Sequence, residues 1–168
     1  RRDAARVREP AWRASTTAGR SGPPARALVA VVFLALLRPA SAFQPSSKGE
    51  LQTAVNLWVS DERSAKDTYG PIADWDTHLI TDMSNLFQDK TLFNDDISSW
   101  STASVTNMLM MFSNAQAFNQ PIGSWSTASV TNMQSTFSGA LAFNQDLSSW
   151  STASLTDTTH MFAGATAF

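Results

Sequence analysis

The sequence predicts a repeat solenoid of about four 25-residue coils, each a short strand plus a short helix, behind an N-terminal helical cap. Two observations predict this fold class. Four tryptophans recur at one fixed interval along the sequence, and two rows of phenylalanine keep the same interval without slipping. One such unit cannot bury its apolar side chains alone, so we expect identical units to stack and form a common core.

Six apolar positions recur in this way, and each coil contributes one residue to each row. The rows are Ile72/Ile97/Ile122/Leu147, Trp75/Trp100/Trp125/Trp150, Ile80/Val105/Val130/Leu155, Met83/Met108/Met133, Phe87/Phe112/Phe137/Phe162 and Phe93/Phe118/Phe143/Phe168. Only the methionine row breaks, at Thr158. This 25-residue period falls in the range of leucine-rich repeats and below that of helix-pair repeats, so the predicted solenoid is LRR-like.

Within one unit, apolar residues at spacings of three and four predict a helix of about two turns. These residues are Val105, Met108, Met111, Phe112 and Ala115. Thr106 or Asn107 is placed to cap the start of that helix. The strand is expected at 94–100, with a bend near Ser98–Ser99 because strict alternation cannot place Ile97 and Trp100 on one face.

Residues 43–70 do not repeat and predict the N-terminal helical cap. Ser47 and Glu50 have the spacing of a capping box. Behind them, four apolar residues follow at helical spacing, namely Leu51, Ala54, Val55 and Trp58. A second short helix is expected at 60–67, stopped by Gly70-Pro71. Residues 71–168 then form the repeats, which break off within the last unit.

Residues 1–42 predict a signal or targeting presequence. Arginines precede an apolar run at 27–37, and Ala40-Ser41-Ala42 supplies small residues for cleavage after Ala42. The run is shorter than the roughly 20 residues that cross a bilayer, and a buried core helix is the alternative. The stretch ASAFQP resembles the ASAF cleavage motif of plastid-targeted proteins in algae with complex plastids. Secretion or display at the cell surface is our first expectation and the plastid the alternative.

The charge is divided unevenly along the chain. Residues 1–42 carry a balance of +6 and the remainder −8, and no Lys or Arg follows Lys90. Nucleic-acid binding depends on cations that neutralise phosphates, so it is excluded as a function of the repeats. The absence of cysteine excludes a disulfide framework, thiolate zinc sites and a cysteine nucleophile. Because the chain begins without Met and stops inside a repeat, we expect it to be a fragment.

The repeats and the segment before them resemble the BspA-like leucine-rich-repeat surface proteins. The residues that carry this resemblance are ELQTAVNLWVSDERSAKDTYGPIADWDTHLITDMSNLF, followed by units such as FNQDLSSWSTASLTDT. The resemblance implies an LRR-like solenoid on a secreted or surface protein, with adhesion or partner binding as its role and no catalytic residues. The sequence departs from the family pattern where Ser101, Ser126 and Ser151 replace an Asp that survives only at Asp76.

No catalytic, cofactor-binding or metal-binding residues are predicted, so the protein is not expected to be an enzyme. His78 and His160 occupy different repeat positions and lack partners at metal-ligand spacing. Asp95 and Asp146 could form a glycosidase pair across two coils, but nothing else in the sequence supports such a site.

Polar, uncharged rows beside the tryptophans form the predicted binding face. Its residues are Ser99, Ser101, Thr102, Ser124, Ser126, Thr127, Ser149, Ser151 and Thr152. These side chains could instead serve only as turn and ladder hydrogen bonders. The expected partner is an extracellular protein or polysaccharide, with neither a small-molecule substrate nor nucleic acid.

Two other functions stay open at this point. The repeats could be the non-catalytic part of a larger extracellular hydrolase, or a surface for ice or mineral. We further expect self-association through the uncapped last coil, because its apolar residues would face solvent.

Overall fold

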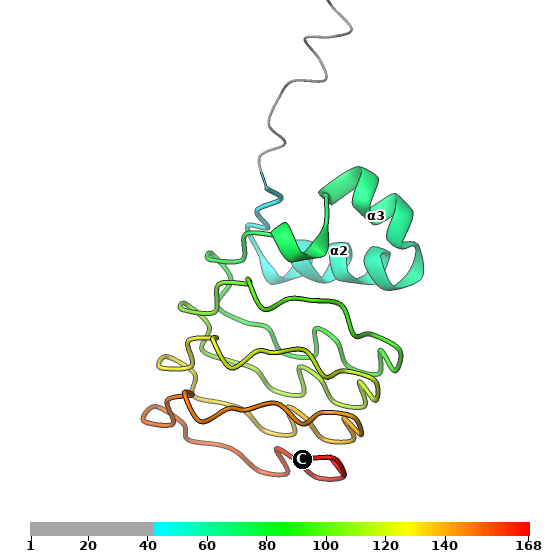
Figure 1. Cartoon of the computed structure of the whole chain (residues 1–168). Helices are drawn as coiled ribbons and strands as arrows, with labels where there is room; N and C mark the ends of the chain where they lie inside the picture. The colour runs from blue at the N-terminus through cyan, green and yellow to red at the C-terminus, as the bar shows by residue number, and fades with distance from the viewer. Residues whose placement is uncertain (1–41) are drawn as a thin grey trace, which may run out of the picture. The chain divides into compact units, whose positions relative to one another are not determined.

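The computed structural model describes residues 42–168, and these form one compact unit. Apart from Ala42, the predicted presequence lies outside the described residues. The described part begins with two helices, α2 (Lys48–Ser60) and α3 (Glu62–Tyr69), and a short 3-10 turn, η1 (Ile72–Asp74). A stack of looped segments follows them (Figure 1). No helix in residues 42–168 is long and apolar enough to cross a membrane.

Helix α2 begins at the capping pair that the sequence predicts. The Ser47 hydroxyl accepts a hydrogen bond from the backbone N–H of Glu50 at 3.3 Å, and the Glu50 carboxylate accepts one from the N–H of Ser46 at 2.9 Å. The first bond satisfies one of the N–H groups that a helix start leaves free, and the second ties the Glu50 side chain to the residue before the N-cap. The four residues predicted for its apolar face, Leu51, Ala54, Val55 and Trp58, are buried.

Asp61 ends α2 and starts α3. Its N–H donates to the carbonyl of Leu57 at 2.7 Å, and its carboxylate accepts from the N–H of Ser64 at 3.1 Å. Helix α3 ends at Gly70, whose φ of 75° lies in the left-handed region that suits glycine. The second helix therefore lies about two residues later than the sequence pattern predicts.

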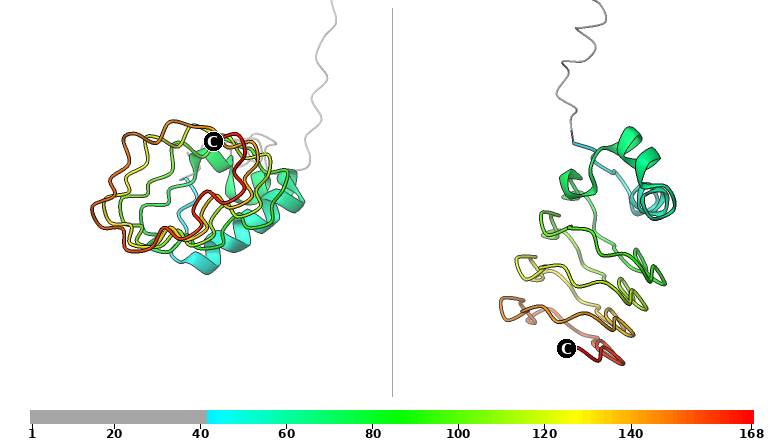
Figure 2. Two further views of the ribbon diagram at one scale, coloured as in Figure 1. Left: turned by 90° about the horizontal axis from the view of Figure 1, so that it is seen from below. Right: turned by 45° about the vertical axis from the view of Figure 1, so that its right-hand side comes forward.

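Residues 71–168 form four coils, at 71–95, 96–120, 121–145 and 146–168, that lie nearly over one another when viewed from below (Figure 2). The predicted fold class is wrong in what it places inside each coil. The described residues contain no strand, and α2, α3 and the short η1 are the helical segments among them. The predicted strand at 94–100 is irregular backbone with one turn at Ser98–Ser99, and the predicted helix over 105–115 is a single bridge residue followed by successive turns at 109–114.

Backbone hydrogen bonds between coils explain why no helix forms at 105–115. Every second N–H in this segment donates to a carbonyl of the next coil, at 2.7–2.9 Å. The donors are Met108, Met110, Phe112 and Asn114, and the acceptors are Asn132, Gln134, Thr136 and Ser138. In an α-helix the same N–H groups would donate to carbonyls four residues earlier. Because the next coil takes these donors, the segment cannot be helical.

Residues with positive φ also interrupt helical geometry twice in each coil. Met110 and Asn114 have φ values of 53° and 57°, in the left-handed region. The equivalent residues of the other coils are also left-handed, namely Asn85, Ser135 and His160 for the first position and Asp89, Gly139 and Gly164 for the second. Each of these two residues lies inside a turn closed by a hydrogen bond to the carbonyl three residues earlier, from Met111 to Met108 at 3.1 Å and from Ala115 to Phe112 at 3.0 Å. Successive turns of this kind bury residues that are three or four positions apart, as a helix would, so the apolar spacing could not distinguish the two.

One position per coil shows strand-like pairing, and it is not extended into a strand. Parallel bridges join Asp82, Asn107, Asn132 and Asp157 in succession. The side-chain oxygen of each residue accepts a hydrogen bond from the N–H two residues later, as in Asn107 and Leu109 at 3.0 Å. Such Asx turns offer the backbone a local alternative to a ladder, so the pairing stops after one residue.

The apolar rows form columns through the core. Rings of Phe87, Phe112, Phe137 and Phe162 stack with centroids 5.3–5.5 Å apart, and those of Phe93, Phe118, Phe143 and Phe168 with centroids 5.8–6.0 Å apart. Trp100, Trp125 and Trp150 also form hydrogen bonds across coils: the indole N–H of Trp125, for example, donates to the carbonyl of Ile97 at 3.3 Å. The turn after Ile97 buries both Ile97 and Trp100, as the predicted bend requires.

We predict that Trp125→Ala lowers the free energy of unfolding by about 3–5 kcal/mol, because it leaves a cavity between two coils and frees the Ile97 carbonyl. Trp150→Ala is the matched control, since Trp150 lies in the last described coil and is only partly buried. It should cost clearly less. Urea denaturation followed by circular dichroism measures both. Equal losses in the two variants would show that the column is not packed between coils.

Acid should destabilise the fold by protonating the two aspartates, Asp82 and Asp157, of the row of Asx turns at Asp82, Asn107, Asn132 and Asp157. The N–H of Thr159 lowers the pKa of Asp157. Burial raises the pKa of Asp82, but hydrogen bonds from Ser84 and the Lys48 ammonium outweigh it, so this pKa is also lowered. Carboxyls with a lowered folded pKa stabilise the fold above their unfolded pKa of about 4, and this stability is lost as the pH falls through the folded pKa.

We therefore predict that the urea midpoint falls below pH about 4. The double variant Asp82→Asn/Asp157→Asn should show a weaker fall, because Asn107 and Asn132 already fill the same row position with a neutral acceptor. Urea titrations at a series of pH values compare the two proteins. An unchanged acid dependence in the double variant would rule out a contribution from this row.

Candidate functional site

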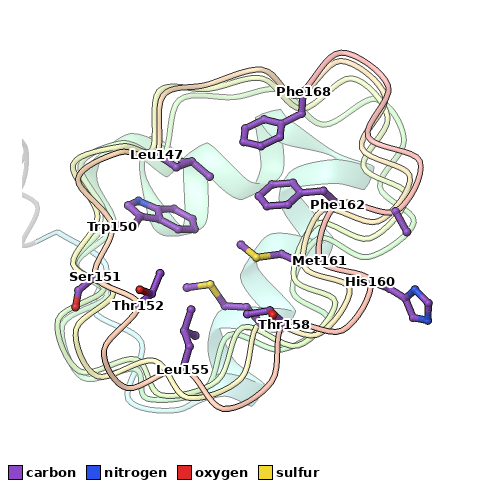
Figure 3. A pocket seen from close by; sticks show the side chains of 12 residues that line it. Leu147, Trp150, Ser151, Thr152, Leu155, Thr158, His160, Met161, Phe162 and Phe168 are labelled. Carbon is purple, nitrogen blue, oxygen red and sulfur yellow. The ribbon is translucent and has the colours of Figure 1, made fainter.

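The structure separates the predicted binding face into an inner and an outer set. Thr102 and Thr127 are only 2% and 1% exposed, so they cannot contact a partner. Their hydroxyls donate to the carbonyls of Ser126 and Ser151 in the next coil, at 3.0 and 2.9 Å. Thr152 is exposed in coil 4, where it points toward the interior of the coil (Figure 3). The threonine row therefore joins coils and does not form a contact surface.

The six predicted serines lie on the outside of coils 2–4. Ser99, Ser124, Ser126 and Ser149 are exposed, and Ser101 and Ser151 are half-buried. Two further rows that were not predicted as part of the binding face are also at the surface, Ser104/Ser129/Ser154 and Thr106/Thr131/Thr156. We call these four rows together the hydroxyl surface. The sequence could have predicted these two rows, because their serines and threonines recur every 25 residues on either side of the apolar positions Val105 and Val130.

Most hydroxyls of this surface donate their proton to the preceding coil. Thr106, Thr131 and Thr156 donate to the carbonyls of the equivalent residues one coil earlier, at 3.2, 3.1 and 2.9 Å. The serines that do the same, with their acceptors, are Ser99 (Ala73), Ser124 (Ser98), Ser129 (Ala103), Ser149 (Gly123) and Ser154 (Ala128). A hydroxyl has one proton and two lone pairs. The surface therefore presents fixed hydrogen-bond acceptors to the outside.

The hydroxyl surface becomes acidic where it reaches coil 1. A hollow of about 370 Å³ lies there, lined by Ala73, Asp74, Trp75, Asp76, Ser99 and Ser101. A hydrogen bond from the His78 ring, at 2.7 Å, is the main cause that lowers the pKa of Asp76, and the Gln44 amide donates to the same carboxylate at 2.9 Å. Asp76 is therefore anionic at neutral pH. Asp74 and Asp76 also line a second hollow of about 810 Å³ beside Phe43 and Tyr69.

Groups considered for catalysis are not assembled into a site. Asp95 accepts a hydrogen bond from the Trp58 indole at 3.0 Å, which ties α2 to coil 1. Asp146 accepts one from the N–H of Ser148 at 2.8 Å, which lowers its pKa. His160 is an exposed residue of coil 4. In residues 42–168, no three side chains of His, Asp or Glu are grouped so that they could hold a metal ion.

The fold and its outer rows define a protein of stacked repeat coils with a polar lateral surface. The family model described as "Mycoplasma protein of unknown function, DUF285" matches residues 58–168, which include the end of α2, all of α3 and all four coils. The chain therefore belongs to this family. No curated protein and no solved structure matches the chain.

The division of the face into inner threonines and outer serines predicts different mutational costs. Thr127→Val removes the donor to the Ser151 carbonyl and leaves that acceptor unpaired between coils, so it should cost about 1–3 kcal/mol. Ser126→Ala changes an exposed side chain and should stay within about 0.5 kcal/mol of the parent protein. Thermal or urea unfolding measures both. The assignment fails if Thr127→Val is as stable as Ser126→Ala.

Proposed function

We propose that the protein is a non-catalytic binding module, secreted or displayed at the cell surface, that holds an extracellular protein or polysaccharide through its hydroxyl surface. The observation that carries this proposal is the repetition of outward hydrogen-bond acceptors at one position after another in coils 2–4. The resemblance to BspA-like surface proteins favours the same role. A plastid location and a role as the non-catalytic part of an extracellular hydrolase are the alternatives.

The direction of the hydroxyl hydrogen bonds narrows the chemistry of the partner. Because the protons of Thr106, Thr131 and Thr156 point to carbonyls of the preceding coil, their free lone pairs suit a partner that donates. The hydroxyl groups of a polysaccharide and the side-chain amides of a repetitive protein are donors of this kind. A small molecule that needs a deep, largely apolar pocket is a poor match for a lateral surface.

Repetition suits a partner that is itself repetitive. Hydroxyl side chains are short, and most of those on this surface are already fixed by their bonds to the preceding coil, so little entropy remains to be lost when they bind. Weak contacts made by several coils at once add up to a much tighter attachment than one contact provides. Since the rows of coils 2–4 carry no charge, binding should depend only weakly on salt.

The proposal predicts a position-dependent effect of added charge. In the triple variant Ser101→Lys/Ser126→Lys/Ser151→Lys, long cations cover the middle of the hydroxyl surface. Its binding to a glycan and matrix-protein array should fall by about tenfold or more relative to the parent chain, equivalent to about 1.4 kcal/mol. Binding of the parent chain should change little between low and high salt.

The chain offers a matched control at another repeat position. Thr91, Gln116 and Leu141 are exposed and occupy equivalent positions of successive coils, so Thr91→Lys/Gln116→Lys/Leu141→Lys adds the same charge at the same interval. This control should bind like the parent. If both triple variants bind equally well, the hydroxyl surface is not the binding surface. Strong loss with salt in the parent would direct attention to Asp74 and Asp76 instead.

A further inference from the structure

The segment that precedes α2 is held against coil 1 by its backbone and by its side chains. The N–H of Asp76 donates to the carbonyl of Phe43 at 2.9 Å, and the Gln44 amide donates to the Asp76 carboxylate at 2.9 Å. Pro45 is buried. Residues 43–45 therefore belong to the folded unit, and Phe43 is the first described residue that hydrogen bonds hold in place.

The Phe43 ring covers one end of the row of tryptophans. Its centroid lies 4.5 Å from that of Tyr69 and 5.3 Å from that of Trp75, in tilted and edge-on arrangements. Trp75 in turn stacks on Trp100, with centroids 6.0 Å apart. Aromatic pairs in tilted and edge-on orientations attract one another beyond the area that they bury. The ring therefore contributes to the cap at the end where no coil precedes Trp75.

The peptide bond between Ala42 and Phe43 lies at the larger of the two hollows beside coil 1. Both residues of this bond line that hollow, and so do three acidic residues, Asp67, Asp74 and Asp76. The Phe43 N–H donates to no backbone carbonyl within residues 42–168. Three carboxylates thus share a hollow with a backbone nitrogen that has no backbone acceptor in the described part of the chain.

The charge of this hollow is negative at neutral pH. Lys66 also lines it, but the Lys66 ammonium pairs with the Glu62 carboxylate and lies 5.4 Å from the centroid of the Trp58 ring. The His78 ring hydrogen-bonds to the carboxylate of Asp76. Even with His78 protonated, the three carboxylates outnumber the two cations. A cation placed in this hollow would be attracted to it.

Cleavage after Ala42, which the sequence predicts, would create such a cation. Hydrolysis adds water across the Ala42–Phe43 bond, so that Ala42 leaves with a carboxylate and Phe43 keeps the nitrogen as an α-ammonium group. Before cleavage this nitrogen is a neutral amide. The reaction therefore changes the charge at the hollow and leaves the contacts of the Phe43 ring and carbonyl in place.

We propose that the α-ammonium group of Phe43 is a structural group of the mature protein, held in the hollow by the carboxylates of Asp67, Asp74 and Asp76. It ties the segment 43–45 to α3 and coil 1, so removal of the presequence strengthens the cap. This inference rests on the predicted cleavage and is independent of the hydroxyl surface and of the proposed partner.

Proteins that differ only at the N-terminus test the proposal. They are residues 43–168 with a free terminus, the same chain acetylated at Phe43, and an acetylated chain of residues 40–168. The N–H of Asp76 donates to the Phe43 carbonyl, so its hydrogen exchange should be about threefold or more slower with the free terminus than in the other two proteins. Exchange at Phe112, whose acceptor lies in coil 3, should differ less and shows that each protein is folded.

The expected pH dependence has a definite sign. Carboxylates favour the charged form, so they should raise the pKa of the Phe43 α-ammonium above its ordinary value of about 7.7–8.0. The extra protection of the Asp76 amide is then present below about pH 8 and is lost as the pH rises through the raised pKa. A ¹⁵N NMR titration of Phe43 measures this pKa. The titratable groups around the ammonium are Lys66, Asp67 and Tyr69 from α3, and Asp74, Asp76 and His78 from coil 1.

Matched variants separate these carboxylates from others on the surface. Asp74→Asn/Asp76→Asn should return the pKa of the ammonium toward its ordinary value and remove most of the difference between free and acetylated termini. Asp96→Asn/Asp146→Asn alters two exposed carboxylates of coils 2 and 4 and should leave both quantities unchanged.

The cleavage itself is tested on the full chain, expressed in a host with a secretory pathway. N-terminal sequencing of the processed product should begin at Phe43, and a product with any other first residue would overturn the proposal. Equal exchange of the Asp76 amide in the free and acetylated proteins would also overturn it. So would an ammonium pKa that is the same in the parent and in Asp74→Asn/Asp76→Asn.

Discussion

The hydrogen bond from one coil's backbone to the next is the interaction on which the rest of this structure depends. In coils 1–3, alternate N–H groups such as that of Phe112 donate to a carbonyl of the following coil. These bonds favour coils of equal length, because a residue inserted within the bonded segment of one coil would displace its donors and acceptors relative to the neighbouring coils. They also place each side chain over its equivalent, so the columns of Trp and Phe follow from the register.

The polar exterior follows from the same register. Stacking turns a carbonyl of one coil toward the hydroxyl of the next. The hydroxyls of Thr131 and Ser129 therefore donate to the preceding coil, and their lone pairs face outward. A serine-rich surface on an ordinary loop could rotate its hydroxyls to suit any partner. Here the fold fixes the orientation, which is why the proposed partners are donors.

Much of the core could be predicted from the sequence, because burial follows the 25-residue rows whatever the local backbone does. Phe112 and Met108 are buried as the pattern requires. The local backbone could not be predicted, since turns that span three residues and a helix give nearly the same apolar spacing. The Phe112 N–H donates to the carbonyl of Thr136, which lies a full coil away, so the pattern of neighbouring residues could not predict this bond. A repeated hydroxyl likewise looks the same whether it points inward, as at Thr127, or outward, as at Ser126.

The most direct test is the hydrogen-bond partner of the Phe112 amide, measured by NMR scalar coupling through the hydrogen bond on the ¹⁵N,¹³C-labelled chain. Here the N–H of Phe112 lies 2.9 Å from the carbonyl oxygen of Thr136, so we predict a coupling between the Phe112 nitrogen and the Thr136 carbonyl carbon. A coupling to the Met108 carbonyl carbon would be the signature of an α-helix and would contradict this account of the fold.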